Sequence, residues 1–473
     1  MRALLRSLLP SLLLLALVPV PASAQAAAAH KLMYAPGKSV TLMLPHELDI
    51  HIVARGIPRA RFFTQSPDGR IFLTSMYNLA DNTRGAVYIL DGYDAKTHSY
   101  TKITPYLTHL RNPNNLAFWT DPATQQTWLY LPLTDKLVRY RYKAGDLHPS
   151  GEPEMLTKYP DYGLGYKYGG WHLTRTVAIG TLHGRTRVYV AVGSSCNYCK
   201  EREAVRAAIT AMDPDGKNLS IVAHGMRNAV DMRFVQELDG GALFASNMGD
   251  DHLGVEMPDD PFFELDSNDH PGPIAQKTPP HYGWPTCYFA HGTPTHDSSP
   301  LPDNPGENDA AVAEKPLETQ RIYGKQPANI KGAGTNLAAQ VHTQTGPDLG
   351  PVQEPLASCE HVPAVYAWFQ AHGAPLGFAY FGEESKVLRN SFLVALHGPG
   401  AGRPDNPAYR IVRFTPGDRT PRDFLTGFWT PTTTDIFHAS GRPCGLLRLG
   451  PDKFLMSDDK YGIVYLVEPN QGS

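Results

Sequence analysis

The sequence predicts an all-β chain in which one strand–turn–strand unit occurs six times. In each unit an apolar alternating run leads into a polar turn and then into a second run rich in β-branched and aromatic residues, whereas helical periodicity is scarce. The units begin near residues 63, 116, 177, 232, 376 and 446. Apart from the interval between the fourth and fifth units, this spacing suits a four-stranded blade with long loops. We therefore expect a six-bladed β-propeller.

Each unit is a hairpin with a recognisable turn, because Pro, Asp or Gly separates its two runs. The segments are FTQSPDGRIFLTSM (63–76), LAFWTDPATQQTWLYL (116–131), VAIGTLHGRTRVYVAV (177–192), MRFVQELDGGALFASN (232–247), residues 376–396 and LLRLGPDKFLMS (446–457).

Residues 257–362 separate the fourth unit from the fifth and are dense in Pro, Gly, His and Asp. A structureless loop of this length is unusual in a compact domain and is commonly functional or disordered. The segment has too little periodic apolar pattern for a core of its own, which disfavours an independent small domain. We expect an insertion between blades four and five.

The amino-acid composition and the net charge disfavour some classes of protein. The 473 residues are 42% apolar and 19% charged, and the formal net charge is −3 with both signs scattered along the chain. Such a chain folds and buries a sizeable core. Its charge pattern disfavours both a nucleic-acid-binding protein and a polybasic membrane-binding protein.

Residues 1–24 differ from the rest of the chain. Arg2 and Arg6 precede an apolar run from Leu8 to Val20, and a small-residue Ala-Ser-Ala sequence ends at Ala24. This is the pattern of a cleavable signal peptide, whereas a membrane anchor is disfavoured because the run is short and contains prolines. We expect residues 25–473 to form one secreted or periplasmic propeller domain without a membrane span.

Five cysteines would enter an oxidising compartment with this chain, where pairing is common. Cys196 and Cys199 form a C-x-x-C motif, which is compatible with a haem attachment site, a redox motif, half of a zinc site or a local disulfide. Lys200 stands where a haem motif needs His, and the chain has no second C-x-x-C. A local disulfide is therefore favoured. A bridge between Cys287 and Cys359 would close the base of the insertion.

Candidate functional residues lie in loops next to the hairpins. The clusters are YGGWHLTR before the third hairpin, GMRN before the fourth, LHG at the end of the fifth and SGRP before the sixth. In a propeller the loops that enter the innermost strands meet at one mouth of the central channel. His172, Arg227 and Arg442 would then face one axis, where guanidinium groups suit a flat ligand with several carboxylates.

At this level of detail the sequence resembles the soluble quinoprotein glucose and sorbosone dehydrogenases, especially their sorbosone and pyranose dehydrogenase branch. The likeness runs from about Arg61 to Val467 and covers the insertion poorly. It rests on GGWHLTRT, VGSSCNYC, RAAITAMDPDG, HGMRNAVDMRF, SNMGDD, HYGWPTCY, HGAPLGFAYF, FLVALHG and GRPCGLLRLGPDKFLMSDD. The family implies a six-bladed propeller that binds pyrroloquinoline quinone (PQQ) and Ca²⁺.

The resemblance also implies roles for individual residues. His172 would be the catalytic base, and the cofactor contacts would be Arg227, Asn228, His397 and Arg442. The backbone carbonyls of Gly249 and Asp250 would hold calcium. Two departures are seen: the family's Arg-Asn-Pro is Arg227-Asn228-Ala229, and its Leu-His-Gly-Ser-Trp-Asn-Arg is replaced by LHGPGAGR at 396–403. Both departures would lie at the mouth of the central channel, where the substrate would enter.

The function implied is oxidation of a sugar or sugar-derived aldehyde by hydride transfer to the quinone. Electrons would pass to a separate cytochrome or quinone, because the chain has no c-type haem motif. A secreted binding module without catalysis is the second hypothesis, and a calcium-dependent lactonase ranks last because the clusters are cationic. Spacing, export and the family pattern together predict the disulfides Cys196–Cys199 and Cys287–Cys359 and an unpaired Cys444.

Overall fold

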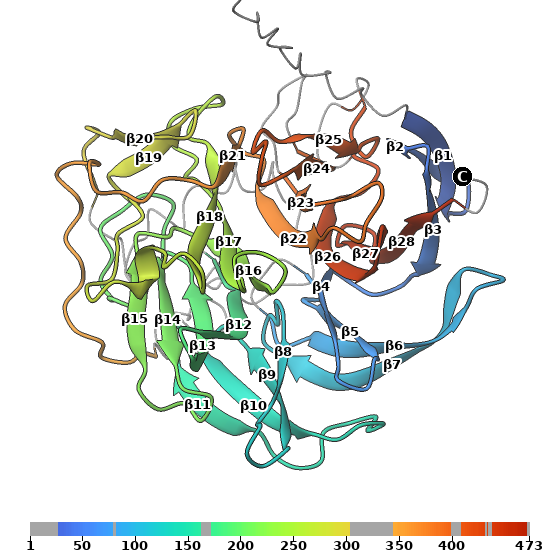
Figure 1. Ribbon diagram of the computed structural model, residues 1–473, viewed down its shortest axis with the longest axis horizontal. Helices are drawn as coiled ribbons and strands as arrows, with labels where there is room; N and C mark the ends of the chain where they lie inside the picture. Colours follow the sequence, from blue (N-terminus) through green and yellow to red (C-terminus); the bar gives the residue numbers. More distant parts are fainter. Residues whose placement is uncertain are drawn as a thin grey trace, which may run out of the picture.

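A computed structural model describes residues 27–78, 82–161, 172–302, 344–398, 408–430, 433 and 438–470. Within these ranges the structure is all-β, and its one helical element is the short 3₁₀ turn η1 (Pro273–Ala275). Six antiparallel four-stranded sheets surround a central axis (Figure 1). The predicted six-bladed propeller is therefore confirmed.

The first three blades follow one another along the chain, and each begins with its innermost strand. Their strands are β4 (Ala60–Gln65), β5 (Ile71–Ser75), β6 (Gly85–Asp94) and β7 (Ser99–Leu110); β8 (Ala117–Thr120), β9 (Thr127–Pro132), β10 (Lys136–Tyr142) and β11 (Glu154–Lys158); β12 (Arg175–Leu182), β13 (Arg185–Val192), β14 (Ala208–Met212) and β15 (Ser220–His224).

The last three blades use strands that are distant in sequence. They comprise β16 (Ala229–Val235), β17 (Ala242–Asn247), β18 (Asp260–Ser267) and β21 (Ala367–Phe369); β22 (Pro375–Phe381), β23 (Ser391–Leu396), β24 (Arg410–Phe414) and β25 (Arg422–Leu425); β26 (Pro443–Gly450), β27 (Lys453–Asp458), β28 (Ile463–Pro469) and β3 (Leu48–Ala54). The ring thus closes where β3 pairs with β28.

Two hairpins lie outside the six blades. The hairpin of β1 (Ala27–Ala35) and β2 (Lys38–Pro45) contacts blade five, where Met43 exchanges backbone hydrogen bonds with Thr426. The hairpin of β19 (Cys287–Ala290) and β20 (Thr293–His296) belongs to the long segment after β18.

The long segment is shorter than the sequence pattern indicated. Strand β18 falls inside residues 257–362, yet it is the third strand of blade four, so the irregular part begins at 268. The chain then returns through β21, which is the outermost strand of the same blade, before it enters blade five. Pro258 and Pro261 interrupt the strand pattern around β18, which is why the pattern placed the boundary too early.

Apolar side chains pack between neighbouring blades. Between blades four and five, the rings of Phe244 and Phe392 are 5.0 Å apart, and Phe262 contacts Phe378 at 4.9 Å. These rings are almost completely buried and meet mainly edge to face, a favourable geometry for aromatic pairs. Because every sheet has one such partner on each side, the blades are held at fixed angles around the axis.

The innermost strands approach each other closely at the axis, and two glycines make this possible. A Cβ on Gly377 would lie 2.6 Å from the carbonyl oxygen of Cys444, and one on Gly445 would lie 2.2 Å from that of Arg61. No side chain fits at either position. Buried Phe62, Leu376 and Cys444 fill the axis around them.

Both predicted disulfides are present. Cys196 is bonded to Cys199 and Cys287 to Cys359, with Cα atoms 6.2 and 5.8 Å apart, and Cys444 is a buried free thiol. Burial raises the pKa of Cys444 to about 12, so this thiol is protonated and unreactive at neutral pH.

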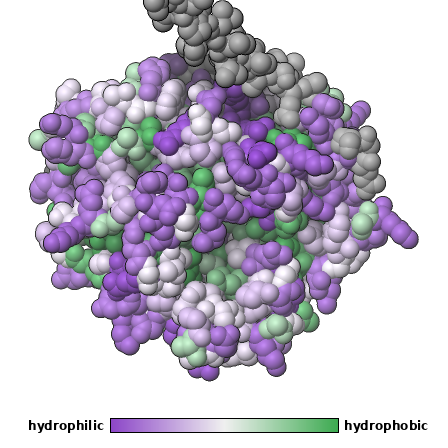
Figure 2. Space-filling view, in the orientation of Figure 1, coloured by the Kyte–Doolittle hydropathy of each residue, from purple (hydrophilic) through white to green (hydrophobic). Residues whose placement is uncertain are grey.

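The outer surface is mainly hydrophilic in the view of Figure 2, and hydrophobic side chains are seen mostly in recesses between the blades. Within the described ranges, no helix has the length and apolar character needed to cross a membrane. Residues 1–24, the predicted signal peptide, lie outside the described residues. Two disulfides are typical of proteins that fold in extracellular or periplasmic compartments.

Candidate functional site

One end of the innermost strands gathers the predicted functional residues. His172 precedes β12, Arg227 and Asn228 precede β16, His397 follows β23, and Arg442 precedes β26. A chain of hydrogen bonds connects the two sides of the site. The Gly249 and Ala374 N–H groups donate to the two oxygens of Asp260 (2.7 Å each), and the His397 N–H donates to Ala374 O (3.1 Å).

His172 is oriented by Ser194. Its Nδ1 lies 3.0 Å from both the carbonyl oxygen and the hydroxyl oxygen of Ser194, and that hydroxyl donates to Cys196 O at 2.6 Å. A carbonyl can only accept, so the proton of the neutral ring is on Nδ1 and the lone pair is on Nε2. Burial and then Arg227 lower the pKa of His172 well below its usual value. The ring is therefore a neutral proton acceptor at pH 7.

Arg227 is held by the loop between the paired cysteines. Its Nε donates to Asn197 O at 3.0 Å, Nη2 donates to Asn197 Oδ1 at 2.6 Å, and Nη1 donates to Gly249 O at 2.6 Å. Asn197 Oδ1 also accepts the Asp251 N–H at 3.0 Å, and Asn197 O accepts Trp284 Nε1–H at 3.2 Å. Asn197 thus fixes the plane of a buried guanidinium group.

Asn228 and His172 lie on the two sides of Gly193. A Cβ on Gly193 would be 2.5 Å from His172 Cβ and 2.9 Å from Asn228 Oδ1. The Asn228 backbone N–H donates to Asn247 Oδ1 at 2.9 Å. The lack of a side chain at position 193 therefore allows the candidate base and the Asn228 amide to lie close together.

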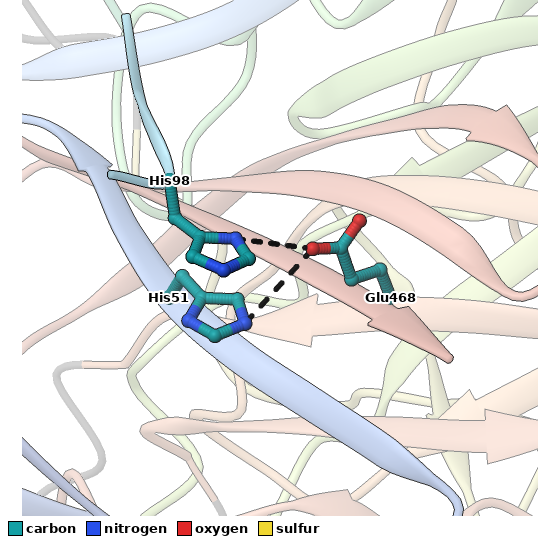
Figure 3. A group of neighbouring side chains, drawn as sticks. All are labelled: His51, His98 and Glu468. Carbon is teal, nitrogen blue, oxygen red and sulfur yellow. Dashed lines mark ion pairs between the residues drawn. The ribbon is translucent and has the colours of Figure 1, made fainter. Parts of the chain in front are cut away.

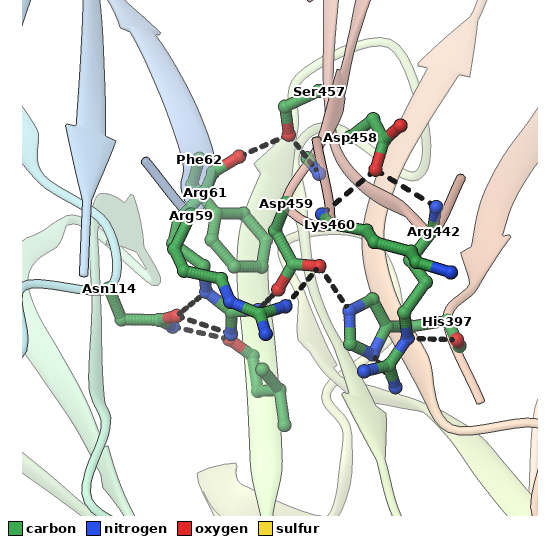
Figure 4. Close-up of polar contacts among 12 residues, drawn as sticks. Arg59, Arg61, Phe62, Asn114, His397, Arg442, Ser457, Asp458, Asp459 and Lys460 are labelled. Carbon is green, nitrogen blue, oxygen red and sulfur yellow. Dashed lines mark hydrogen bonds and ion pairs between the residues drawn. The ribbon is translucent and has the colours of Figure 1, made fainter. Parts of the chain in front are cut away.

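A second group of buried side chains surrounds Asp459 (Figure 4). His397 Nε2 lies 2.8 Å from Asp459 Oδ1, and Arg61 Nη1 lies 3.3 Å from Asp459 Oδ2. Arg59 Nη1 approaches Oδ1 at 3.4 Å. Burial alone would raise the pKa of Asp459, but His397 and Arg59 lower it well below its ordinary value. This ionised carboxylate joins blades one, five and six.

Arg442 packs against His397. Its Nη2 donates to His397 Nδ1 at 2.8 Å and to Gly398 O, while Nε donates to His397 O at 3.1 Å. Arg442 cannot accept a hydrogen bond, so the proton of His397 is on Nε2 and faces Asp459. Burial and then Arg442 lower the pKa of His397 to about 4, so the ring is neutral at pH 7.

The group has an excess of positive charge. The partly exposed Arg59 and the buried Arg61 and Arg442 face one ionised carboxylate, Asp459, since His397 is neutral. Burial raises the pKa of Asp458 to about 7, so this second carboxyl group offsets at most one more charge. Buried charges are costly unless they are compensated, so this lining fits an anionic ligand, and guanidinium groups suit carboxylates in particular.

Gly249 and Asp250 follow β17 and contribute oxygen atoms. Gly249 O already accepts from Arg227, while Asp250 Oδ1 lies 2.6 Å from His252 Nδ1. A carbonyl has a second lone pair, and the carboxylates of Asp251 and Asp260 lie on the same loop and the strand that follows it. Carbonyl and carboxylate oxygens are the ligands that Ca²⁺ prefers, so this donor set fits calcium.

Several residues of the site were absent from the sequence-based candidates, namely Arg59, Arg61, Asn114, Asn197, Asp260 and Asp459. Asn114 accepts from Arg61 at 2.9 and 3.2 Å, and its own amide donates to Thr176 Oγ1 and Val230 O. Only Asn197 carried a local signal, because it stands inside the C-x-x-C motif.

Comparison with solved structures shows a fold similar to those of several sugar dehydrogenases. No known family profile matches the chain, and no curated protein sequence matches it. Several solved structures resemble it with 11–16% sequence identity, so the likeness concerns the fold.

Three of these structures illustrate the likeness. The holo form of the pyranose dehydrogenase PQQ domain from Coprinopsis cinerea has a TM-score of 0.59 at 16% identity, covering 91% of this chain and 97% of that one. The calcium structure of the Trichoderma reesei enzyme of Carbohydrate-Active Enzymes Family AA12 has a TM-score of 0.59 at 15% identity, covering 90% and 96%. The apo form of the soluble aldose sugar dehydrogenase from Escherichia coli has a TM-score of 0.50 at 11% identity, covering 89% and 100%. The resemblance indicated by the sequence motifs is thereby confirmed at the level of the fold.

Proposed function

We propose that the chain is a PQQ- and calcium-dependent dehydrogenase that oxidises a sugar or a sugar-derived aldehyde. The observation that carries the proposal is the pairing, at one end of the propeller, of a neutral histidine base with an excess of guanidinium charge. A histidine base alone would suit many reactions, and a cluster of arginines alone would suit a protein that only binds an anion. Together they suit oxidation of an alcohol by a carboxylated quinone, and the similarity to solved sugar dehydrogenases also supports this function.

Each residue has a distinct role in this proposal. His172 Nε2 takes the hydroxyl proton of the substrate, because its lone pair is fixed there by the Nδ1 contact to Ser194. Arg227, Asn228, His397 and Arg442 line the cofactor position. Of these, the two arginines attract the cofactor carboxylates, and neutral His397 keeps Arg442 in place through its own Nδ1.

When bound, PQQ would supply a hydride acceptor and Ca²⁺ would supply Lewis-acid chemistry. The carbonyl oxygens of Gly249 and Asp250 would hold the metal. Asp260 supports this loop by accepting the Gly249 N–H. The hydroxyl proton passes to His172 Nε2, and the hydride would pass to the bound cofactor, so the substrate would leave as a carbonyl or lactone product.

The finer details are also proposals. The substrate would be an aldose or a sorbosone-like aldehyde, and a separate cytochrome or quinone would reoxidise the cofactor. Residues 1–24 would direct the chain to the periplasm or the exterior and would then be removed, leaving residues 25–473 as the propeller domain.

One experiment separates this enzyme from a propeller that only binds its ligand. The purified chain is mixed with PQQ and Ca²⁺, and its absorption spectrum is recorded before and after addition of each sugar in an aldose panel. A shift to the reduced quinone, together with dye reduction, supports the proposal. Bound quinone that no sugar reduces would indicate a binding module instead, and the absence of quinone binding would contradict both.

A further inference from the structure

Three side chains of metal-ligating types meet where the ring of blades closes, and none of them is among the residues of the candidate site. His51 lies on β3, Glu468 lies on β28, and His98 is in the turn between β6 and β7 (Figure 3). His98 Nδ1 is 3.3 Å from Glu468 Oε1, and His51 Nε2 is 3.9 Å from the same oxygen. One nitrogen of each ring and one carboxylate oxygen lie within 4.8 Å of one another.

The two imidazole rings are stacked, with centroids 3.7 Å apart and planes 11° from parallel. Each ring directs one nitrogen towards Glu468 in Figure 3. Imidazole ligates a metal through a nitrogen atom of its neutral ring, and each of these rings offers one such atom beside the Glu468 carboxylate.

Glu468 is oriented by a second partner. Lys453 Nζ lies 2.7 Å from Glu468 Oε2 and thereby leaves Oε1 facing the histidines. Carboxylates that bind metals are commonly held in this way by an outer hydrogen bond. Asp49, two residues before His51, adds a second negative charge that acts on His51, so the carboxylates outnumber the lysine.

We propose that His51, His98 and Glu468 form a binding site for a divalent transition-metal ion of the Zn²⁺ type. Two imidazole nitrogens and one carboxylate oxygen are ligands that suit zinc, nickel and copper, whereas calcium takes oxygen ligands. At Zn–ligand distances of about 2.1 Å, tetrahedral ligand atoms stand roughly 3.4 Å apart. The contact of His98 Nδ1 with Glu468 Oε1 already has about this length, and the contact of His51 Nε2 with the same oxygen is slightly longer at 3.9 Å.

The position of the site suggests what the metal does. A bound ion would connect the N-terminal strand β3, the C-terminal strand β28 and the first blade at one point. Because β3 and β28 come from opposite ends of the chain and pair within blade six, such a connection would stabilise the closed propeller. The metal would bind the folded state selectively and so raise the melting temperature.

The test uses untagged, metal-depleted protein titrated with ZnCl₂ by calorimetry, and with CoCl₂ followed by visible absorption. The key variant is His98→Asn, because His98 has φ of +46° and asparagine tolerates this conformation. His109→Asn is the matched control, since His109 has φ of +57° on β7 and lies outside the cluster. Glu468→Gln removes the charge of the third ligand at nearly constant shape.

The wild type and the His109→Asn variant are expected to bind one Zn²⁺ at this site and to gain thermal stability. In His98→Asn and Glu468→Gln the affinity should fall by at least about tenfold, and the Co²⁺ band should lose intensity. The proposal is wrong if the wild type binds Zn²⁺ no more tightly than His98→Asn, or if His109→Asn weakens binding equally. In either case the cluster would be an ion pair with stacked rings. None of these readouts depends on PQQ.

Discussion

Asn197 receives two hydrogen bonds from the guanidinium group of Arg227, one on its backbone oxygen and one on its side-chain oxygen. Asn197 stands between Cys196 and Cys199, so the disulfide restricts the loop that makes both contacts. The same loop orients His172, because the Ser194 hydroxyl that contacts His172 donates to Cys196 O. The candidate base and a candidate cofactor ligand therefore share one support.

Replacement of Asn197 should disturb cofactor binding although this residue is not a proposed cofactor ligand. In Asn197→Ala, Arg227 loses a charge-assisted hydrogen bond, and we expect PQQ affinity to fall by about tenfold. Asn197→Asp keeps an acceptor oxygen at the same place and should restore part of this affinity. Titration of both variants with PQQ at fixed Ca²⁺ measures the effect, and equal loss in the two would indicate a general folding defect.

His172→Asn should abolish turnover and leave quinone binding almost unchanged. Asparagine is chosen because φ of His172 is +52°, a conformation that asparagine adopts with little strain. Loss of a general base costs about 10²–10⁴ in rate. Steady-state dye reduction at saturating PQQ gives the rate, and a quinone titration gives the affinity. Near wild-type turnover in this variant would make His172 a structural residue.

The pH profile should report the buried state of His172. Burial and Arg227 lower its pKa, so the neutral base persists as the pH falls through 6.5. We expect kcat/KM for the sugar to stay level through this range and to decline with a slope of one only at lower pH. A decline centred at 6.5 or above would show that an exposed histidine controls the reaction.

Arg227→Ala and Arg442→Ala should each weaken PQQ affinity by roughly ten- to a hundredfold, since a charge-assisted hydrogen bond contributes about 1.5–3 kcal/mol. Lysine should restore only part of the affinity, because it keeps the charge and loses the planar fork. Arg185, exposed on the outer surface and paired with Asp213, supplies the matched control Arg185→Ala. Unchanged affinity in both channel variants would remove the main support for a quinoprotein.

The hairpins of all six blades could be predicted from the sequence, because each is encoded by an adjacent alternating pattern and turn. The fourth strands of blades four and six could not be predicted in this way. Strand β21 follows a gap of about a hundred residues after β18, and β3 lies at the opposite end of the chain from β28. Their pairing is decided by tertiary packing, which leaves no local signal.

The same distinction applies to the site. His172, Arg227 and Arg442 stand next to the hairpins in phase with the repeat, so their convergence could be inferred from the propeller geometry. Arg61 and Asp459 are paired across a separation of 398 residues, and neither is unusual in its local sequence. Their pairing, and the contact of Asp459 with His397, follow only from the closed ring.

The closure of the ring by β3 and β28 also has a consequence for the order of events during biosynthesis. Strand β3 is made first among the strands of blade six, and its partner is made more than four hundred residues later. During this interval β3 presents an unpaired strand edge, the kind of surface through which chains associate. Ring closure is thus a late step with a long loop to close, and a chain that stops before Ile463 would leave two adjoining edges exposed, one on β27 and one on β3.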